Sequence, residues 1–111
     1  MKNNETKMQL IREEDIFDLI KRRRFQILVH SYIYYKLNDN IISNATFDKW
    51  AEELIELQEK YPQISEKVEL YNAFSDFKNV GDAAKLPLDN DPRLDNRARQ
   101  LLRDCRDSKE I

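Results

Sequence analysis

Aromatic side chains gather at the end of one predicted helix and at the start of the next. His30 and Tyr34 lie four residues apart and so share one face of a helix. The turn at residues 38–40 brings the following helix back towards them. Aromatic rings can sandwich a flat cationic ring such as a pyridinium, and a nearby carboxylate favours its charge. The side chains predicted to form such a site are Tyr34, Tyr35, Asn44, Phe47 and Asp48.

Packing between two antiparallel helices is the alternative role for the aromatic residues of this region. Their rings would then fill the space between the helices and bind no ligand. The residue types and spacing permit both interpretations. The residues concerned are His30, Tyr32, Tyr34, Phe47 and Trp50.

The elements that must position these side chains are long helices. Apolar residues recur at helical spacing along most of the chain. Ser43 or Asn44 can cap the second helix, and Asp91 followed by Pro92 can start the last one. The four predicted helices span residues 13–37, 45–60, 65–75 and 92–106, and a loop spans residues 76–90.

These patterns predict an all-α fold of about four helices. Two of them form an antiparallel hairpin, and two further helices follow. With a single glycine among 111 residues, helices are favoured over turn-rich β structure. The predicted organisation is a flexible segment at residues 1–12, a single helical domain at 13–106 and a tail at 107–111.

Composition excludes several classes of function. The formal net charge of −2 creates no global attraction to nucleic acid, so any such contact has to be local. Cys105 is the only cysteine, which excludes an internal disulfide and fits a reducing cytoplasm. No apolar run approaches the ~20 residues of a membrane span, and no metal-ligand spacing occurs. We expect a cytoplasmic protein without a metal site.

The strongest local charge is a run of four basic residues in the first predicted helix. Four consecutive positions fan around a helix, so they do not form a flat phosphate-binding stripe. A solvated cluster is one interpretation, and contact with nucleic acid or an acidic partner is the other. The run consists of Lys21, Arg22, Arg23 and Arg24.

Residues 30–62 resemble the N-terminal helical (Ia) domain of NAD-dependent DNA ligases, which holds the nicotinamide mononucleotide half of NAD. The family pattern is His-x-Tyr-x-Tyr-Tyr/His, an Asp-containing turn, Asp-x-x-Tyr-Asp and an amphipathic helix ending in proline. Asn44 here replaces an Asp of the family, and Phe47 replaces a Tyr. The resemblance implies nicotinamide mononucleotide or NAD at the predicted site, with Asp48→Ala abolishing binding. The matching residues are His30, Tyr32, Tyr34, Tyr35 and Asp48.

Ligation itself is not expected of this chain. Adenylating ligases attack through the lysine of a Lys-x-Asp-Gly motif. The only glycine, Gly81, follows Val80, so the motif is absent. We therefore expect a protein that is not an enzyme. No cofactor is required, although the resemblance allows nicotinamide mononucleotide or NAD to bind.

The second half of the chain resembles small stand-alone phage and prophage proteins related to NAD-dependent DNA ligase. The resemblance rests on residues 71–77, 86–88 and 91–92, ahead of an Arg-rich helix. It implies a non-catalytic phage or mobile-element accessory protein that binds a partner protein, such as a host or counter-defence target. Nicotinamide-nucleotide binding is the alternative, and nucleic-acid contact a third. Partner binding predicts an exposed apolar patch near Tyr61, Ile64 and residues 77–88, in a monomer or a homodimer.

Overall fold

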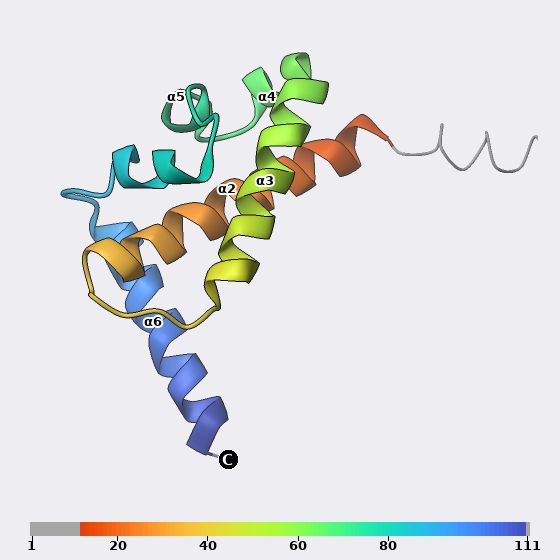
Figure 1. Cartoon of the computed structure of the whole chain (residues 1–111). Coiled ribbons are helices and arrows are strands. Elements are labelled where there is room, and N and C mark those ends of the chain that lie inside the picture. Colours follow the sequence, from red (N-terminus) through yellow and green to blue (C-terminus); the bar gives the residue numbers. More distant parts are fainter. Residues whose placement is uncertain (1–11, 111) are drawn as a thin grey trace, which may run out of the picture.

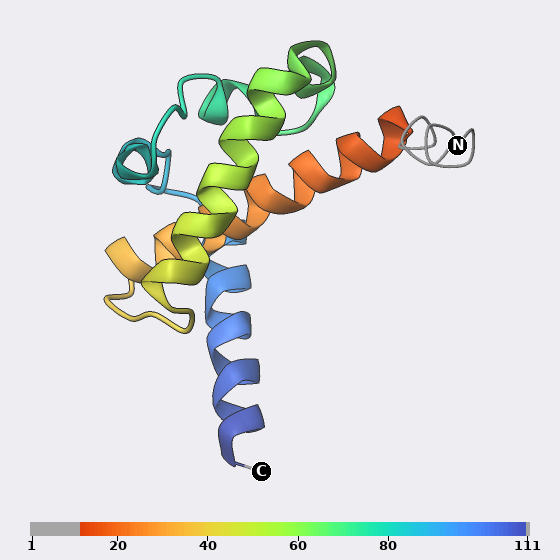
Figure 2. The ribbon, with the colours of Figure 1, turned by 45° about the vertical axis from the view of Figure 1, so that its right-hand side comes forward.

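The computed structural model describes residues 12–110, with side chains placed as far as Arg106, and it is all-α (Figure 1). Helix α2 (Glu13–Tyr35) lies at the centre. Helix α3 (Asn44–Lys60) crosses α2 in the opposite general direction, as the predicted hairpin requires (Figure 2). Helix α6 (Pro92–Glu110) packs on α2, and its C-terminal half extends away from the other helices.

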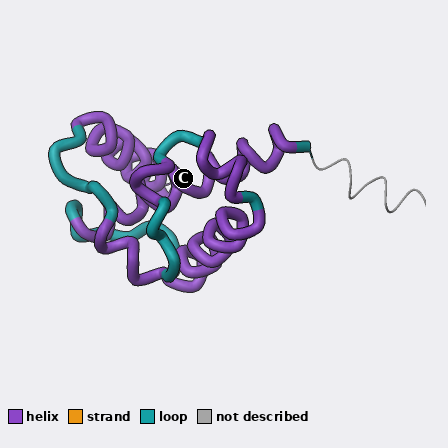
Figure 3. Tube along the Cα trace, turned by 90° about the horizontal axis from the view of Figure 1, so that it is seen from above, coloured by secondary structure: helices purple, strands orange, loops and turns teal. Residues whose placement is uncertain are grey.

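Three short elements complete the described chain. Within residues 12–110 there are six helical segments, three of them long, and no strand (Figure 3). The all-α prediction is confirmed, although the expected number of helices was about four. None of the described helices is long and apolar enough to cross a membrane. The short elements are α4 (Pro62–Lys67), α5 (Tyr71–Phe74) and the 3-10 helix η1 (Val80–Lys85).

The predicted turn and caps are confirmed. Asn38 adopts a positive φ of 54° in the turn after α2. Ser43 caps α3, since its side chain accepts a hydrogen bond from the Thr46 backbone N–H at 3.1 Å. Asp91 caps α6 in the same way, with its Oδ1 3.1 Å from the Leu94 backbone nitrogen. These local hydrogen bonds fix where the two long helices begin.

The predicted helix at residues 65–75 is wrong, because the chain breaks it in two. Leu70 has a φ of 70°, a left-handed conformation that costs a non-glycine residue energy, and it separates α4 from α5. Pro62 begins α4 at a position where proline needs no N–H partner. The apolar spacing of Val68 and Phe74, both buried, gave no indication of this break.

Two further boundaries differ from the prediction. The last helix continues to Glu110, past the expected end at Arg106. The expected loop contains η1, whose start is fixed by the Asp82 carboxylate. Its Oδ2 accepts hydrogen bonds from the backbone N–H groups of Lys78 and Asn79 at 2.8 and 3.1 Å. Because these bonds favour the ionised form, the pKa of Asp82 lies below its ordinary value.

Arg24 is fully buried at the junction of α2, α3 and α4. Its Nε donates to Gln58 Oε1 at 2.9 Å. One terminal nitrogen donates to the carbonyls of Val68 and Glu69 at 3.0 and 3.1 Å. The other donates to the carbonyl and the hydroxyl of Ser65 at 3.2 and 2.6 Å. The guanidinium thus pairs the carbonyls of Val68 and Glu69, which lie beyond the end of α4. It is a second donor to the Ser65 carbonyl, which also accepts from the Val68 backbone N–H at 3.3 Å.

No carboxylate pairs with Arg24 among the described side chains. Burial lowers its pKa from the ordinary value to about 10, while the nearby Tyr71 acts in the opposite direction. The group therefore stays protonated at neutral pH, and neutral oxygen dipoles compensate its charge together with the Tyr71 ring, whose centroid lies 5.9 Å from the guanidinium carbon.

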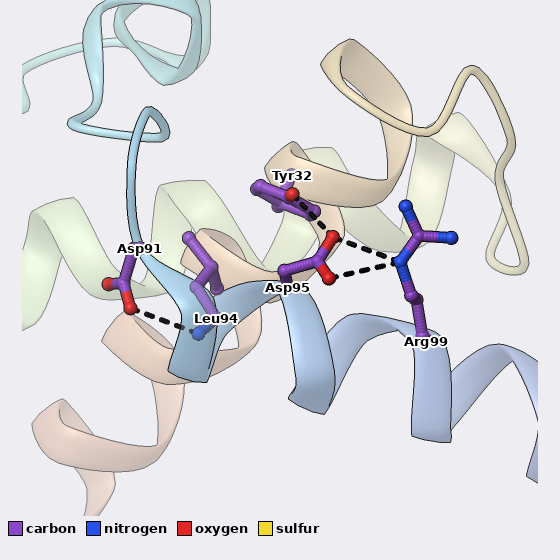
Figure 4. A network of polar contacts seen from close by, with 5 residues as sticks. All are labelled: Tyr32, Asp91, Leu94, Asp95 and Arg99. Atoms are coloured by element: carbon purple, nitrogen blue, oxygen red, sulfur yellow. Dashed lines mark hydrogen bonds and ion pairs between the residues drawn. The ribbon is translucent and has the colours of Figure 1, made fainter.

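A second polar contact fixes α6 on α2 (Figure 4). The Tyr32 hydroxyl donates to Asp95 Oδ1 at 2.7 Å, and Arg99 Nε lies 3.0 Å from both Asp95 oxygens. The hydrogen bond raises the pKa of Tyr32 and lowers that of Asp95. Tyr32 consequently faces α6.

Replacing Arg24 is expected to destabilise the whole fold. Arg24→Met keeps an apolar stem but leaves the carbonyls of Val68 and Glu69 without the donor that Arg24 supplies. Since each unpaired buried group costs about 1–3 kcal/mol, we expect the unfolding free energy to fall by about 2–4 kcal/mol. Urea denaturation followed by circular dichroism measures this.

The matched control is Arg22→Met, at an exposed position two residues away on the same helix. An exposed substitution of this kind changes stability by no more than about 0.5 kcal/mol. Equal unfolding midpoints for the two variants would contradict the role assigned to Arg24.

Candidate ligand-binding site

A pocket of about 220 Å³ lies between the end of α2, the start of α3 and η1. Its walls come from three segments because η1 packs against α2 and α3 (Figure 1). The turn between α2 and α3 adds Asn40 and Ile42. Four of the five side chains predicted for a ring-binding site line this pocket, and these are Tyr34, Tyr35, Asn44 and Phe47.

Two tyrosines at the end of α2 line the solvent side of the pocket. The side chains of Tyr34 and Tyr35 are 54% and 47% exposed. Their rings meet edge to face, with centroids 4.9 Å apart and an interplanar angle of 89°. Phe47 is half-buried opposite them on α3. The pocket is therefore open, and aromatic surface is available to a flat ligand.

Asp48 is the predicted site residue that the structure does not bring to the pocket. It is exposed on α3 and is not among the lining residues. Asn44 takes the place of the other carboxylate in the ligase pattern. As a result, no carboxylate lines the pocket among residues 12–106.

Some of the aromatic residues pack between α2 and α3, as the alternative interpretation of the sequence predicted. The rings of His30 and Trp50 lie 5.4 Å apart at 60°, a contact between α2 and α3. Tyr32 instead contacts α6, and Tyr34 is exposed. Burial lowers the pKa of His30, so its imidazole is neutral at pH 7.

Ser31 is a pocket residue that the sequence analysis missed. Its side chain is 1% exposed, and Oγ has no hydrogen-bond partner among the described residues. Helical spacing could have indicated it, because Ser31 precedes Tyr35 by four residues and so shares its face of α2. An unpaired buried hydroxyl is unusual in a folded protein and needs a reason.

The wall formed by η1 was also missed, since this segment was expected to be a loop. Val80, Gly81 and Ala83 line the pocket there. A Cβ atom on Gly81 would approach Asn79 Oδ1 to 3.1 Å, closer than ordinary contact. The glycine therefore lets the backbone itself form the wall.

The basic run of α2 is dispersed by the fold. Arg24 is buried and has no surface to offer an external partner. Lys21 pairs with Glu69 at 3.1 Å, and Arg23 pairs with Glu53 at 3.0 Å. Contact of Lys21, Arg22 and Arg23 with nucleic acid or an acidic partner stays a prediction.

The apolar patch expected near Tyr61, Ile64 and residues 77–88 does not form. Phe77, Leu86 and Leu88 are buried in the core, and Tyr61 and Ile64 are half-buried against it. These large side chains fill the space under the short elements and leave little apolar surface outside.

An exposed apolar side chain occurs elsewhere, in a groove of about 690 Å³ between α2 and α6. Phe25 is 39% exposed there. Val29 and Leu101 also line the groove, with charged side chains of both signs around them.

Comparison with known proteins finds DNA ligases. The chain is 47% identical over 51 residues to the DNA ligase of Pseudothermotoga lettingae, a match that covers 46% of this chain and 8% of the ligase. It is 40% identical over 62 residues to the enzyme of Thermosipho africanus, covering 56% of this chain and 8% of that protein. For Anoxybacillus flavithermus the identity is 39% over 56 residues, half of this chain and 8% of the ligase.

This chain therefore contains a segment related to DNA ligases. The match spans less than a tenth of the ligases' own length. No family model matches the chain, and no solved structure gives a significant match. The relationship concerns one small part of a ligase. It does not extend to the activity of the whole enzyme.

The buried state of His30 is open to direct measurement. His30 is the only histidine, so its imidazole resonance is unique in a proton spectrum. We expect an NMR titration midpoint below 6.5, since burial disfavours the charged ring.

Stability should follow the same titration. The unfolded chain takes up this proton at higher pH than the folded one, so His30 favours folding above about pH 6.5 and this contribution is lost as the pH falls through the lowered pKa. His30→Gln should reduce the loss of stability between pH 7.5 and 5. A midpoint at or above 6.5 would show that the ring is solvated.

Proposed function

We propose that this chain is a non-catalytic module whose pocket binds the nicotinamide ring of nicotinamide mononucleotide or NAD. One observation carries the proposal. Four of the five residues that the ligase resemblance associates with this ligand, from two helices, line one open pocket, and these are Tyr34, Tyr35, Asn44 and Phe47.

The chemistry of the walls suits this ligand. The pyridinium of nicotinamide mononucleotide is flat and cationic, and the faces of Tyr34, Tyr35 and Phe47 offer negative π surface to it. The neutral imidazole of His30 does not repel the ring at pH 7. Asn44 can donate to and accept from the ligand's amide.

Binding without ligation is the proposed activity. The ligase match covers a small part of those enzymes. The Lys-x-Asp-Gly motif of adenylation is absent from this sequence. A module of this kind would sense, sequester or present the nucleotide and leave chemistry to another protein.

Isothermal titration calorimetry with nicotinamide mononucleotide tests the proposal. We expect a micromolar to submillimolar dissociation constant for the wild type. Tyr34→Leu should weaken binding about tenfold, because a cation–π contact contributes about 1–2 kcal/mol. Tyr34 is more than half exposed, so the variant should fold normally.

Phe25→Leu is the matched control, an exposed aromatic residue of the same helix that does not line the pocket. Asp48→Ala tests the resemblance itself. Because Asp48 lies outside the lining, we now expect a modest loss where the ligase pattern implied abolition. No heat of binding at millimolar ligand would refute the proposed function.

A protein partner is the second candidate, and the groove between α2 and α6 favours it. Phe25 and Leu101 offer apolar surface there, flanked by Arg22 and Arg97. In this second proposal the chain is an accessory protein of a phage or mobile element, as the resemblance of its second half to phage proteins implies. A partner captured by the wild type but not by Phe25→Asp would support it, while capture by both variants would exclude the groove.

A further inference from the structure

We propose that the groove between α2 and α6 binds a second copy of this chain, so that two molecules pair about a twofold axis with their α6 helices antiparallel. Such pairing does not depend on nicotinamide binding, and it makes the chain itself the protein partner of the groove. Three features support it, namely the projecting end of α6, the apolar floor of the groove and the charges beside that floor.

Helix α6 extends beyond the part of the molecule that supports it (Figure 2). Its buried apolar side chains are Leu94, Ala98 and Leu102, which follow one another at helical spacing on the helix that packs on α2. Among the described side chains after Leu102 none is buried, yet the helix continues to Glu110, about two turns further. Helical turns without packing are marginal in water, so contact with a neighbouring helix stabilises such an end.

The floor of the groove is apolar and partly open to solvent. Phe25 and Val29 lie one turn apart on α2, and Leu101 contributes from α6. Phe25 is exposed and Leu101 is half-buried. A groove of about 690 Å³ between two long helices has the form that accepts a third helix through apolar contacts.

The charges beside this floor are balanced, which favours a second copy over a strongly charged partner. Neither sign dominates, so a polyanion such as nucleic acid gains no net attraction. A surface with both signs can complement itself when a twofold axis places it against its own copy. The acidic side chains are Asp18, Glu69 and Asp104, and the basic ones are Lys21, Arg22 and Arg97.

Two of these charges flank Leu101 on α6. Arg97 precedes Leu101 by four residues and Asp104 follows it by three, so all three share one face of the helix. Neither Arg97 nor Asp104 forms an ion pair with another described side chain. When two α6 helices run antiparallel and cross at Leu101, the Arg97 of each copy lies beside the Asp104 of the other. The pair then has a leucine contact at its centre and an ion pair on each side.

Sedimentation equilibrium from micromolar to submillimolar protein measures the pairing. We expect a dimer with a dissociation constant of about 10–100 µM. Reversing either charge should weaken the dimer at least about tenfold, because like charges then meet on both sides of the leucine contact. The single variants are Arg97→Asp and Asp104→Arg, both at exposed positions, so each should fold normally, which circular dichroism checks.

An equimolar mixture of the two variants is the decisive sample. One variant is acidic at both positions and the other is basic at both, so a mixed pair regains two attractive contacts. We expect the mixture, and the double variant Arg97→Asp/Asp104→Arg, to dimerise within about threefold of the wild type. Arg93→Asp is the matched control and should leave the dissociation constant unchanged, since Arg93 is exposed on α6 and does not line the groove.

The outcomes are distinct from those of the nicotinamide titration, because no ligand is present. A wild type that stays monomeric at submillimolar concentration overturns the pairing and leaves the groove to another protein. A dimer that neither single reversal weakens, or that the mixture does not restore, excludes the antiparallel contact of α6 and overturns the pairing as well.

Discussion

The burial of one guanidinium determines how the helices of this protein fit together. Arg24 reaches from the middle of α2 to Gln58 on α3 and to carbonyls at and beyond the end of α4. The chain breaks after α4, and that break exposes the oxygens that the arginine needs. The hydrogen bonds between the guanidinium and these oxygens offset both the cost of the left-handed Leu70 and the cost of burying a charge. The segment that follows α4 starts from this junction, while the Tyr32–Asp95 contact fixes α6 on α2.

Local sequence was enough to predict the long helices, because their determinants are local. Apolar spacing marks α2, α3 and α6, and the Ser43 and Asp91 side chains bind their own backbone. The break at Leu70 could not be predicted in this way, since a residue far away in the sequence stabilises it. For the same reason four successive basic residues separate into one buried, one exposed and two half-buried positions.

The candidate site was only partly predictable. The aromatic residues and Asn44 follow from the ligase-like pattern and from helical spacing, and they do line one pocket. Asp48 matched the pattern, yet it lies on the outer surface of α3. Helical spacing relative to Tyr35 could have indicated Ser31, whereas the η1 wall has no local marker, because it lines the pocket only when residues 80–83 fold back on α2. Tertiary contacts, which a pattern of residue types does not contain, decide these cases.

Helix α2 uses neighbouring residues for opposite purposes within a single turn. Tyr32 holds α6 on one side, while Ser31, Tyr34 and Tyr35 line the pocket on the other. Each added or removed residue turns the following part of a helix by about 100° relative to the part before it. A one-residue insertion after Tyr32 would therefore carry both tyrosines away from the pocket while the anchor to α6 stayed in place. This turn of α2 should therefore tolerate substitutions of its exposed side chains during evolution far better than insertions or deletions.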